Sequence, residues 1–341
     1  MLIPFLIPFI IAIFLAINMG GSGTAPAFSA AYGANIIKKG LIPGLFGLAV
    51  FAGAIIGGGE TAKTLGKGLL EPGMMTFSIV SIILFSVAIS LLIANLFGIP
   101  QSTSQATVMA VVAPALYFQS LNSHKLMWEI IPTWFIMPVA AFILSYLLGK
   151  YIYKPIRKKG YTLSKKINDG YLLKGLVILM SLYVAFSIGT NNVANAVGPL
   201  ATMAANEMEI QDAYFVHLLI LATLIVAPSF AIGSSIFGHK VVRRTGKDIF
   251  LFGRFEAVII AFISASLLLV ASLTRGIPTS LVQLNTAAII GIGVAKLGFK
   301  NIFRKTEVYE FFGMWLIAPI ISFSTSFFFT VLADEFNFLY L

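Results

Sequence analysis

Two copies of one short polar motif stand inside otherwise apolar sequence. The stretch GIPQSTSQ, from Gly98 to Gln105, returns 178 positions later as GIPTSLVQ, from Gly276 to Gln283. A second pair, AINMGGSGTA from Ala16 and AFSIGTNNVA from Ala185, is separated by 169 positions. The similar offsets indicate an internal duplication, with a polar site between two related halves.

The composition is that of a membrane protein. Of the 341 residues, 58% are hydrophobic and 11% charged, and the mean hydropathy is +0.95, which leaves too little polar surface for a soluble globule. The apolar stretches have the length of membrane-spanning helices rather than of barrel strands. The absence of cysteine excludes disulfides, thiolate metal sites and a cysteine nucleophile. The N-terminal stretch predicts a retained first span and no signal peptide.

The apolar stretches predict an all-α integral membrane protein with about five spans in each half. We place these spans near residues 3–19, 41–57, 74–97, 104–119 and 127–149, and then 174–190, 213–237, 253–273, 281–296 and 311–333. The segments after Gly20 and Gly189 are expected as extra short or re-entrant helices. The first membrane repeat covers 1–149, a linker 150–173, and the second repeat 174–341. Because five is odd, tandem duplication predicts an inverted-topology repeat with broken or re-entrant helices at the midplane.

Charge predicts the orientation of the chain. The stretch from Lys150 to Lys174 contains eight basic residues and one acidic residue, Asp169, so the linker is expected in the cytoplasm. Counting spans outward from the linker places both termini outside a cell membrane, either the inner or the plasma membrane. The net charge of +10 is interpreted mostly as this topology signal rather than as a dedicated lipid or nucleic-acid surface. The surrounding membrane lipid is an expected partner and nucleic acid is not.

The repeated motif has the pattern of a helix start. Glycine allows a bend, proline is tolerated near the first turn, and serine or threonine caps free backbone N–H groups. Two such N-termini from inverted repeats converge near the midplane and favour an anion. The predicted donors to this anion are Ser102, Thr103, Ser104, Gln105, Thr279, Ser280 and Gln283. A single motif of this kind is typical of a packing kink, but its duplication favours a binding role.

The second motif pair carries a family resemblance. GTNNVANAVG, from Gly189 to Gly198, together with the paired Pro-x-Ser-Thr type motifs, resembles the PiT family of inorganic phosphate transporters over nearly the whole chain. The resemblance implies cation-coupled uptake of a tetrahedral oxyanion, with both motif pairs around the site. It adds Ser22, Thr24, Asn191 and Asn192 to the expected substrate-binding residues.

The chain departs from the family where the family has one aspartate in each repeat, because the matching positions hold Gly23 and Asn192. A carboxylate can accept a hydrogen bond from protonated phosphate but repels fully ionised sulfate. The stretch from Asn18 to Pro26, together with Gly57 to Glu60, also resembles the sulfate permease branch of the family. The sequence therefore favours sulfate over phosphate.

The coupling ion is Na+ or H+. Asparagine oxygens can coordinate sodium, with Asn18 and Asn195 as candidates beside Asn191 and Asn192, whereas Glu60 is the candidate for proton coupling. We expect import by symport with alternating access and no cofactor. A sodium-coupled phosphate symporter and an anion channel are the alternatives, and a homodimer is left open. With three histidines and no metalloprotease or hydrolase motif, the chain is not expected to be an enzyme.

Overall fold

The protein is an all-α integral membrane protein. The computed structural model describes residues 2–97, 101–153, 170–238 and 253–340, and no strand occurs among these residues. Its α-helices are α1 (Leu2–Gly33), α2 (Ile42–Gly57), α3 (Gly59–Lys67), α4 (Phe77–Phe97), α5 (Thr103–Tyr117), α6 (Ile131–Leu147), α9 (Tyr171–Asn192), α10 (Ala194–Glu207), α11 (Phe215–Val226), α12 (Ser229–Ile236), α14 (Arg254–Arg275), α15 (Leu281–Leu297), α16 (Phe299–Ile302) and α17 (Thr306–Glu335). Short 3-10 or π-helical turns are η1 (Lys39–Leu41), η2 (Pro72–Met74), η3 (Lys125–Ile130), η4 (Leu148–Tyr153), η5 (Asp212–Tyr214) and η6 (Phe338–Tyr340).

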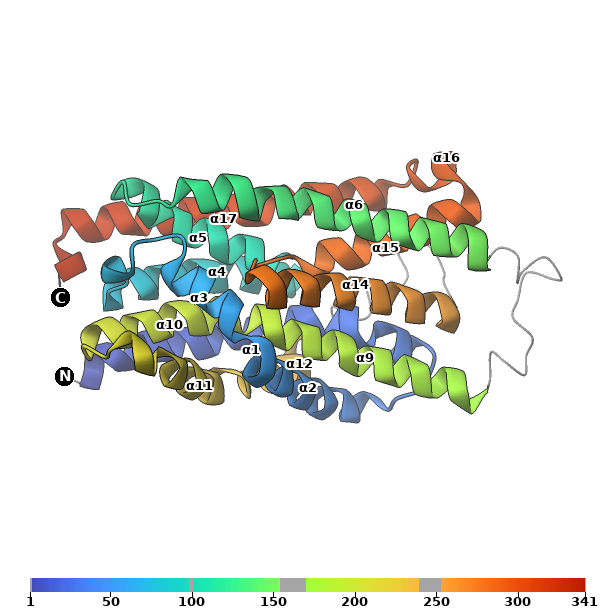
Figure 1. Ribbon diagram of the computed structural model, residues 1–341, viewed down its shortest axis with the longest axis horizontal. Coiled ribbons are helices and arrows are strands. Elements are labelled where there is room, and N and C mark those ends of the chain that lie inside the picture. Colours follow the sequence, from blue (N-terminus) through green and yellow to red (C-terminus); the bar gives the residue numbers. More distant parts are fainter. Residues whose placement is uncertain (1, 98–100, 154–169, 239–252, 341) are drawn as a thin grey trace.

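Eight helical stretches of the described chain are long and apolar enough to cross a membrane. Two of the ten spans expected from the sequence are shorter, because α5 has 15 residues and α15 has 17. Both of these helices begin near the middle of the molecule, and they run toward opposite ends (Figure 1). A helix of about 20 residues is needed to cross the hydrocarbon core, so α5 and α15 are half-helices rather than full spans.

The prediction of a separate short helix after Gly20 is wrong, because α1 continues unbroken from Leu2 to Gly33. Gly20 instead allows the backbone of α1 to touch the backbone of α12, since an added Cβ would collide with the carbonyl oxygen of Phe230. Small residues at membrane helix interfaces have this packing role. In the second half the helix is interrupted at Val193, where α9 ends and α10 begins.

The two halves interlock. The first-half helix α5 packs along the second-half helix α17, and the second-half helix α15 packs along the first-half helix α6. Both chain termini lie at one end of the molecule, and the ends of η4 and α9 that flank the linker lie at the other end (Figure 1). Most of the predicted linker, residues 154–169, lies outside the described residues. Because each half completes the packing of the other, the tips of α5 and α15 are enclosed in the centre.

Candidate functional site

The two half-helices begin in the same way. Ser102 caps α5 and Ser280 caps α15, with backbone φ/ψ of −78°/103° and −86°/107°. Each serine Oγ accepts a hydrogen bond from the backbone N–H three residues later, at 3.3 Å from Gln105 and 3.2 Å from Gln283. The helix-start prediction is therefore confirmed in both copies. The other backbone N–H groups of each first turn carry the positive end of the helix dipole.

Gln105 and Gln283 join the two half-helices directly. The Nε2 of Gln105 donates to the Oε1 of Gln283 at 3.1 Å, and the Nε2 of Gln283 donates back to the Oε1 of Gln105 at 2.9 Å. Both side chains are buried. The two residues occupy the same position in their motifs, 178 residues apart, so matching positions of the two motifs meet in space.

Asn191, from the second motif pair, bridges both half-helix starts. Its Oδ1 accepts from the Oγ of Ser104 at 2.8 Å, and its Nδ2 donates to the Oγ of Ser272 at 2.8 Å and to the backbone oxygen of Ile277 at 3.3 Å. Asn191, Ser104 and Ser272 are completely buried. A single amide thus contacts the first turn of α5 and the segment that leads into α15.

A second group of buried amides lies beside the start of α5. The Nδ2 of Asn195 donates to the Oγ1 of Thr103 at 3.4 Å and contacts the Sδ of Met19 at 3.8 Å. On α1, Asn18 accepts from the Nδ2 of Asn95, at its backbone oxygen at 2.8 Å and at its Oδ1 at 3.3 Å. These contacts bring α1, α4 and α10 to the tip of α5.

Three buried amide oxygens have no hydrogen-bond partner among the described residues, the Oδ1 atoms of Asn95, Asn192 and Asn195. A buried acceptor left unpaired costs about 1–3 kcal/mol, so such atoms mark a place where a ligand can compensate. Carbonyl oxygens are ligands of hard cations, and they coordinate Na+ in broken-helix transporters. These three oxygens are therefore candidate ligands for a bound group of either kind, a hydrogen-bond donor or a cation.

In the described part of the chain, the remaining predicted residues have no hydrogen bond to this cluster, and some bond only to carbonyls of their own helix. The hydroxyls of Ser22 and Thr24 donate to Met19 and Gly20 carbonyls within α1. Thr24 also lines a separate cavity of about 330 Å³ with Lys39 and Ser234.

Thr279 donates to the backbone oxygen of Ile277 at 3.1 Å and so remains at the start of α15. Glu60 lies at the exposed first turn of α3, where its side chain is 58% exposed and pairs with Lys63 at 2.8 Å. The structure does not bring the Glu60 carboxylate to the central amides.

Two participants were missed by the sequence reasoning. Asn95 stands in the last turn of the apolar helix α4, and Ser272 stands one turn before Gly276 in α14. A buried polar residue in an apolar span is the signal that could have identified both, since such residues are costly in a membrane. Gly98, Ile99 and Pro100 of the first motif lie outside the described residues.

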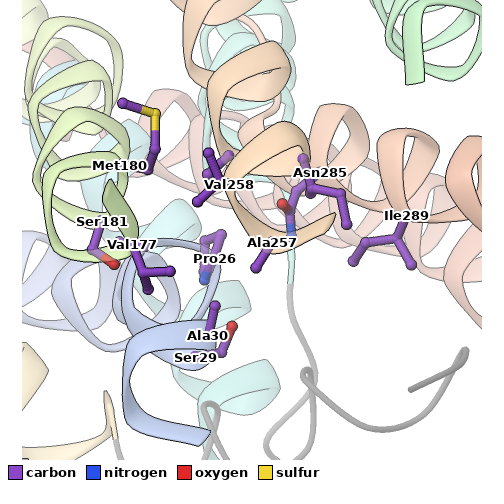
Figure 2. Close-up of a pocket in the computed structure, with 13 residues that line it drawn as sticks. Pro26, Ser29, Ala30, Val177, Met180, Ser181, Ala257, Val258, Asn285 and Ile289 are labelled. Carbon is purple, nitrogen blue, oxygen red and sulfur yellow. The ribbon is translucent and has the colours of Figure 1, made fainter. Parts of the chain in front are cut away.

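A narrow cavity lies between α1, α9, α14 and α15 on the linker side of the cluster. Figure 2 shows the side chain of Asn285 pointing in among Pro26, Ser181 and Ala257. Its volume of about 20 Å³ accommodates roughly one water molecule.

A multi-pass helical bundle with buried polar groups gathered at the tips of two opposed half-helices has the architecture of a membrane transporter. The profile of the Phosphate transporter family matches residues 19–168 and 155–326. The chain belongs to this family.

Two comparisons extend this assignment. The chain is 36% identical over 318 residues to the Sulfate permease CysP of Bacillus subtilis (strain 168), covering 92% of this chain and 84% of that protein. Its fold is similar to the solved structure of a protein named "The sodium-dependent phosphate transporter", with a TM-score of 0.81, 21% identity, and coverage of 97% of this chain and 99% of the other. The family and both relatives are transporters.

Proposed function

We propose that the protein imports sulfate through the membrane by cation symport, with the anion held at the tips of α5 and α15. The observation that carries this proposal is the buried junction of two capped helix starts, to which Asn191 and the paired glutamines contribute amides and hydroxyl residues contribute donors. Helix N-termini, amides and hydroxyls suit a fully ionised dianion. The similarity to a sulfate permease supports the same substrate.

The donors of this site hydrogen-bond to one another in the described conformation. Ser104 is paired with Asn191, and Gln105 with Gln283. An entering oxyanion would replace these contacts and separate the two half-helices by its own width. This exchange gives the substrate a way to drive rocking of one half against the other, as alternating access requires.

Sodium is the coupling ion that we favour. The unpaired oxygens of Asn95, Asn192 and Asn195 support a cation site, whereas exposure and the Lys63 ion pair argue against Glu60 as the proton carrier. Import of a bare dianion into a negative cell costs about 4–5 kcal/mol at 100 mV, before any concentration gradient. At least two cations per sulfate are therefore needed to remove the electrical penalty.

Sodium-coupled phosphate symport is the second candidate, favoured by the similarity of the fold to that of a sodium-dependent phosphate transporter. An anion channel is a third and weaker candidate. A channel would conduct along the membrane potential without accumulating its ion.

The predicted inverted repeat, cytoplasmic linker and external termini are part of the proposal of sulfate symport. The opposite directions of α5 and α15 support the inversion.

Calorimetry of sulfate and phosphate binding to the purified protein, with sodium and then with a large organic cation, tests the proposal. We expect sulfate-selective binding that disappears without sodium. Phosphate-selective binding would favour the second candidate. Unchanged sulfate affinity in all four single variants Ser102→Ala, Thr103→Ala, Thr279→Ala and Ser280→Ala would remove the site as described.

A further inference from the structure

A large apolar cavity lies beside the candidate site, between α5, α6, α15 and α17. Its volume is about 760 Å³. Its walls are formed mainly by aromatic and aliphatic side chains, among them Trp134, Phe142, Phe303 and Trp315. The flanking residues Leu316 and Phe135 are 68% and 69% exposed, so the cavity is continuous with the membrane-facing surface. Figure 1 shows α6 and α17 together along one face of the molecule.

The contents of this cavity are constrained by its chemistry. The amide side chains on its wall, Gln105 and Gln283, are hydrogen-bonded to each other. Water needs several polar partners to occupy a cavity, and apolar walls offer few. The volume lies within the range of roughly 300–1,000 Å³ that is typical of pockets for small organic ligands. This face lies against the bilayer, so a lipid acyl chain is the apolar molecule available to fill the cavity.

The linker end of the cavity has a basic rim. On α6, the wall residue Phe142 stacks on Tyr146, and the Nζ of Lys150 lies 5.6 Å from the Tyr146 ring. Across the cavity, the wall residues Phe299 and Phe303 stack at 4.3 Å. Lys300 and Arg304, which follow them in sequence, are exposed. Glu310 stands two residues before the wall residue Phe312 at this end, where the cations Lys150, Lys300 and Arg304 outnumber it, whereas at the other end Glu129 stands two residues before the wall residue Ile131.

We propose that this cavity binds an anionic phospholipid, with an acyl chain between α6 and α17 and the phosphate at Lys150, Lys300 and Arg304. An apolar body with positive charge at one end complements a molecule that has an apolar chain and one anionic head. A second copy of the protein would present an apolar helix surface and would leave the one-sided basic rim without a partner. The lipid therefore fits the charge distribution better than a dimer contact.

The position of the cavity gives this lipid a role in transport. The glutamine pair that joins α5 to α15 lies on the cavity wall, so an acyl chain there contacts the joint between the two half-helices. Lipid occupancy would stabilise the closed arrangement of the half-helices that the structure describes. The lipid site is independent of whether the transported ion is sulfate or phosphate.

Tryptophan fluorescence provides the test, because the chain has three tryptophans and two of them, Trp134 and Trp315, line the cavity. The Trp128→Phe variant removes the third, which is 75% exposed. This variant is placed in phosphatidylcholine vesicles, and a small fraction of the lipid is replaced by dibrominated phosphatidylglycerol or dibrominated phosphatidylcholine. We expect dibrominated phosphatidylglycerol to quench more strongly than dibrominated phosphatidylcholine. The binding preference for phosphatidylglycerol should be about fivefold for each rim cation.

Two further variants of the Trp128→Phe protein control the result. Lys150→Gln, Lys300→Gln and Arg304→Gln together should abolish the preference, whereas Lys38→Gln with Lys39→Gln, which changes two exposed lysines outside the cavity wall, should retain it. Circular dichroism checks that each variant is folded. Equal quenching by the two lipids, or a preference that survives the rim substitutions, would overturn the proposal. Absence of quenching in a protein that light scattering shows to be dimeric would assign the face to a second copy.

Discussion

The two halves use their second motif differently, although both halves begin a half-helix with the same cap. In the first half, α1 passes through Gly20 to Thr24 without interruption, and the hydroxyls of Ser22 and Thr24 bond to carbonyls of their own helix. In the second half, the helix breaks at Val193, and Asn191 and Asn195 reach α5.

The difference follows from side-chain chemistry. A serine or threonine hydroxyl in a helix can donate to a carbonyl three or four residues earlier, which satisfies it locally. An asparagine amide has two donors and an acceptor at greater reach, so it can connect several helices. The second motif therefore differs in role between the halves: both halves provide helix dipoles, but only the second half's copy provides amides that bond to α5.

The largest expected effect comes from Asn191→Ala compared with Ser22→Ala, its aligned counterpart. Loss of Asn191 leaves Ser104 and Ser272 without their buried partner, and we expect sulfate uptake into proteoliposomes to fall roughly 100-fold or more. Ser22→Ala should change uptake by less than about fivefold, because it removes one hydrogen bond within α1. Similar losses in both variants would contradict the division of roles.

The next effect concerns the joint between the half-helices. Gln105→Leu or Gln283→Leu leaves the other amide buried and unpaired, and each should lower the free energy of unfolding by about 1–3 kcal/mol. The double variant should lose less than the sum of the single losses, with a coupling of about 1 kcal/mol or more. Equilibrium unfolding in mixed micelles measures the free energies of the wild type, the two single variants and the double variant. Strict additivity would mean that the reciprocal pair contributes little.

Gly276→Ala should produce a moderate loss of stability. Gly276 ends α14 with φ of +59°, and an added Cβ would lie 2.5 Å from the backbone oxygen of Glu60. We expect the free energy of unfolding to fall by about 2–3 kcal/mol from backbone strain and collision. Gly298→Ala is the matched control, because it also has positive φ, +87°, but has no neighbour within 4 Å of the new atom. Equal losses would show that strain alone accounts for the effect.

The smallest effect is expected for Glu60→Gln. Its ion pair with Lys63 is exposed, and such pairs contribute about 0–1 kcal/mol. We expect uptake and its sodium dependence to be unchanged, measured with imposed sodium and pH gradients. Loss of uptake driven by a pH gradient would instead identify Glu60 as the proton carrier.

Patterns along the chain were sufficient to predict the membrane class, the repeated helix starts and the residues that cap them. This is because hydropathy over about 20 residues and the hydrogen-bonding needs of a helix terminus are local properties. The family followed from motif similarity in the same way. The candidate cluster was predicted in part, since Ser104, Gln105, Asn191, Asn195 and Gln283 meet, whereas Glu60, Ser22 and Thr24 do not join them.

The sequence by itself determined that this protein is a helical bundle in a membrane, with serine caps at the starts of two helices that share one polar motif. Only the tertiary structure decided that Gln105 meets Gln283, that Asn95 lies against Asn18, and that Gly20 packs helices instead of breaking one. The physical reason is that caps depend on neighbours within one turn, whereas pairing and close packing depend on which helices face each other. That arrangement is fixed by the interlocked halves as a whole.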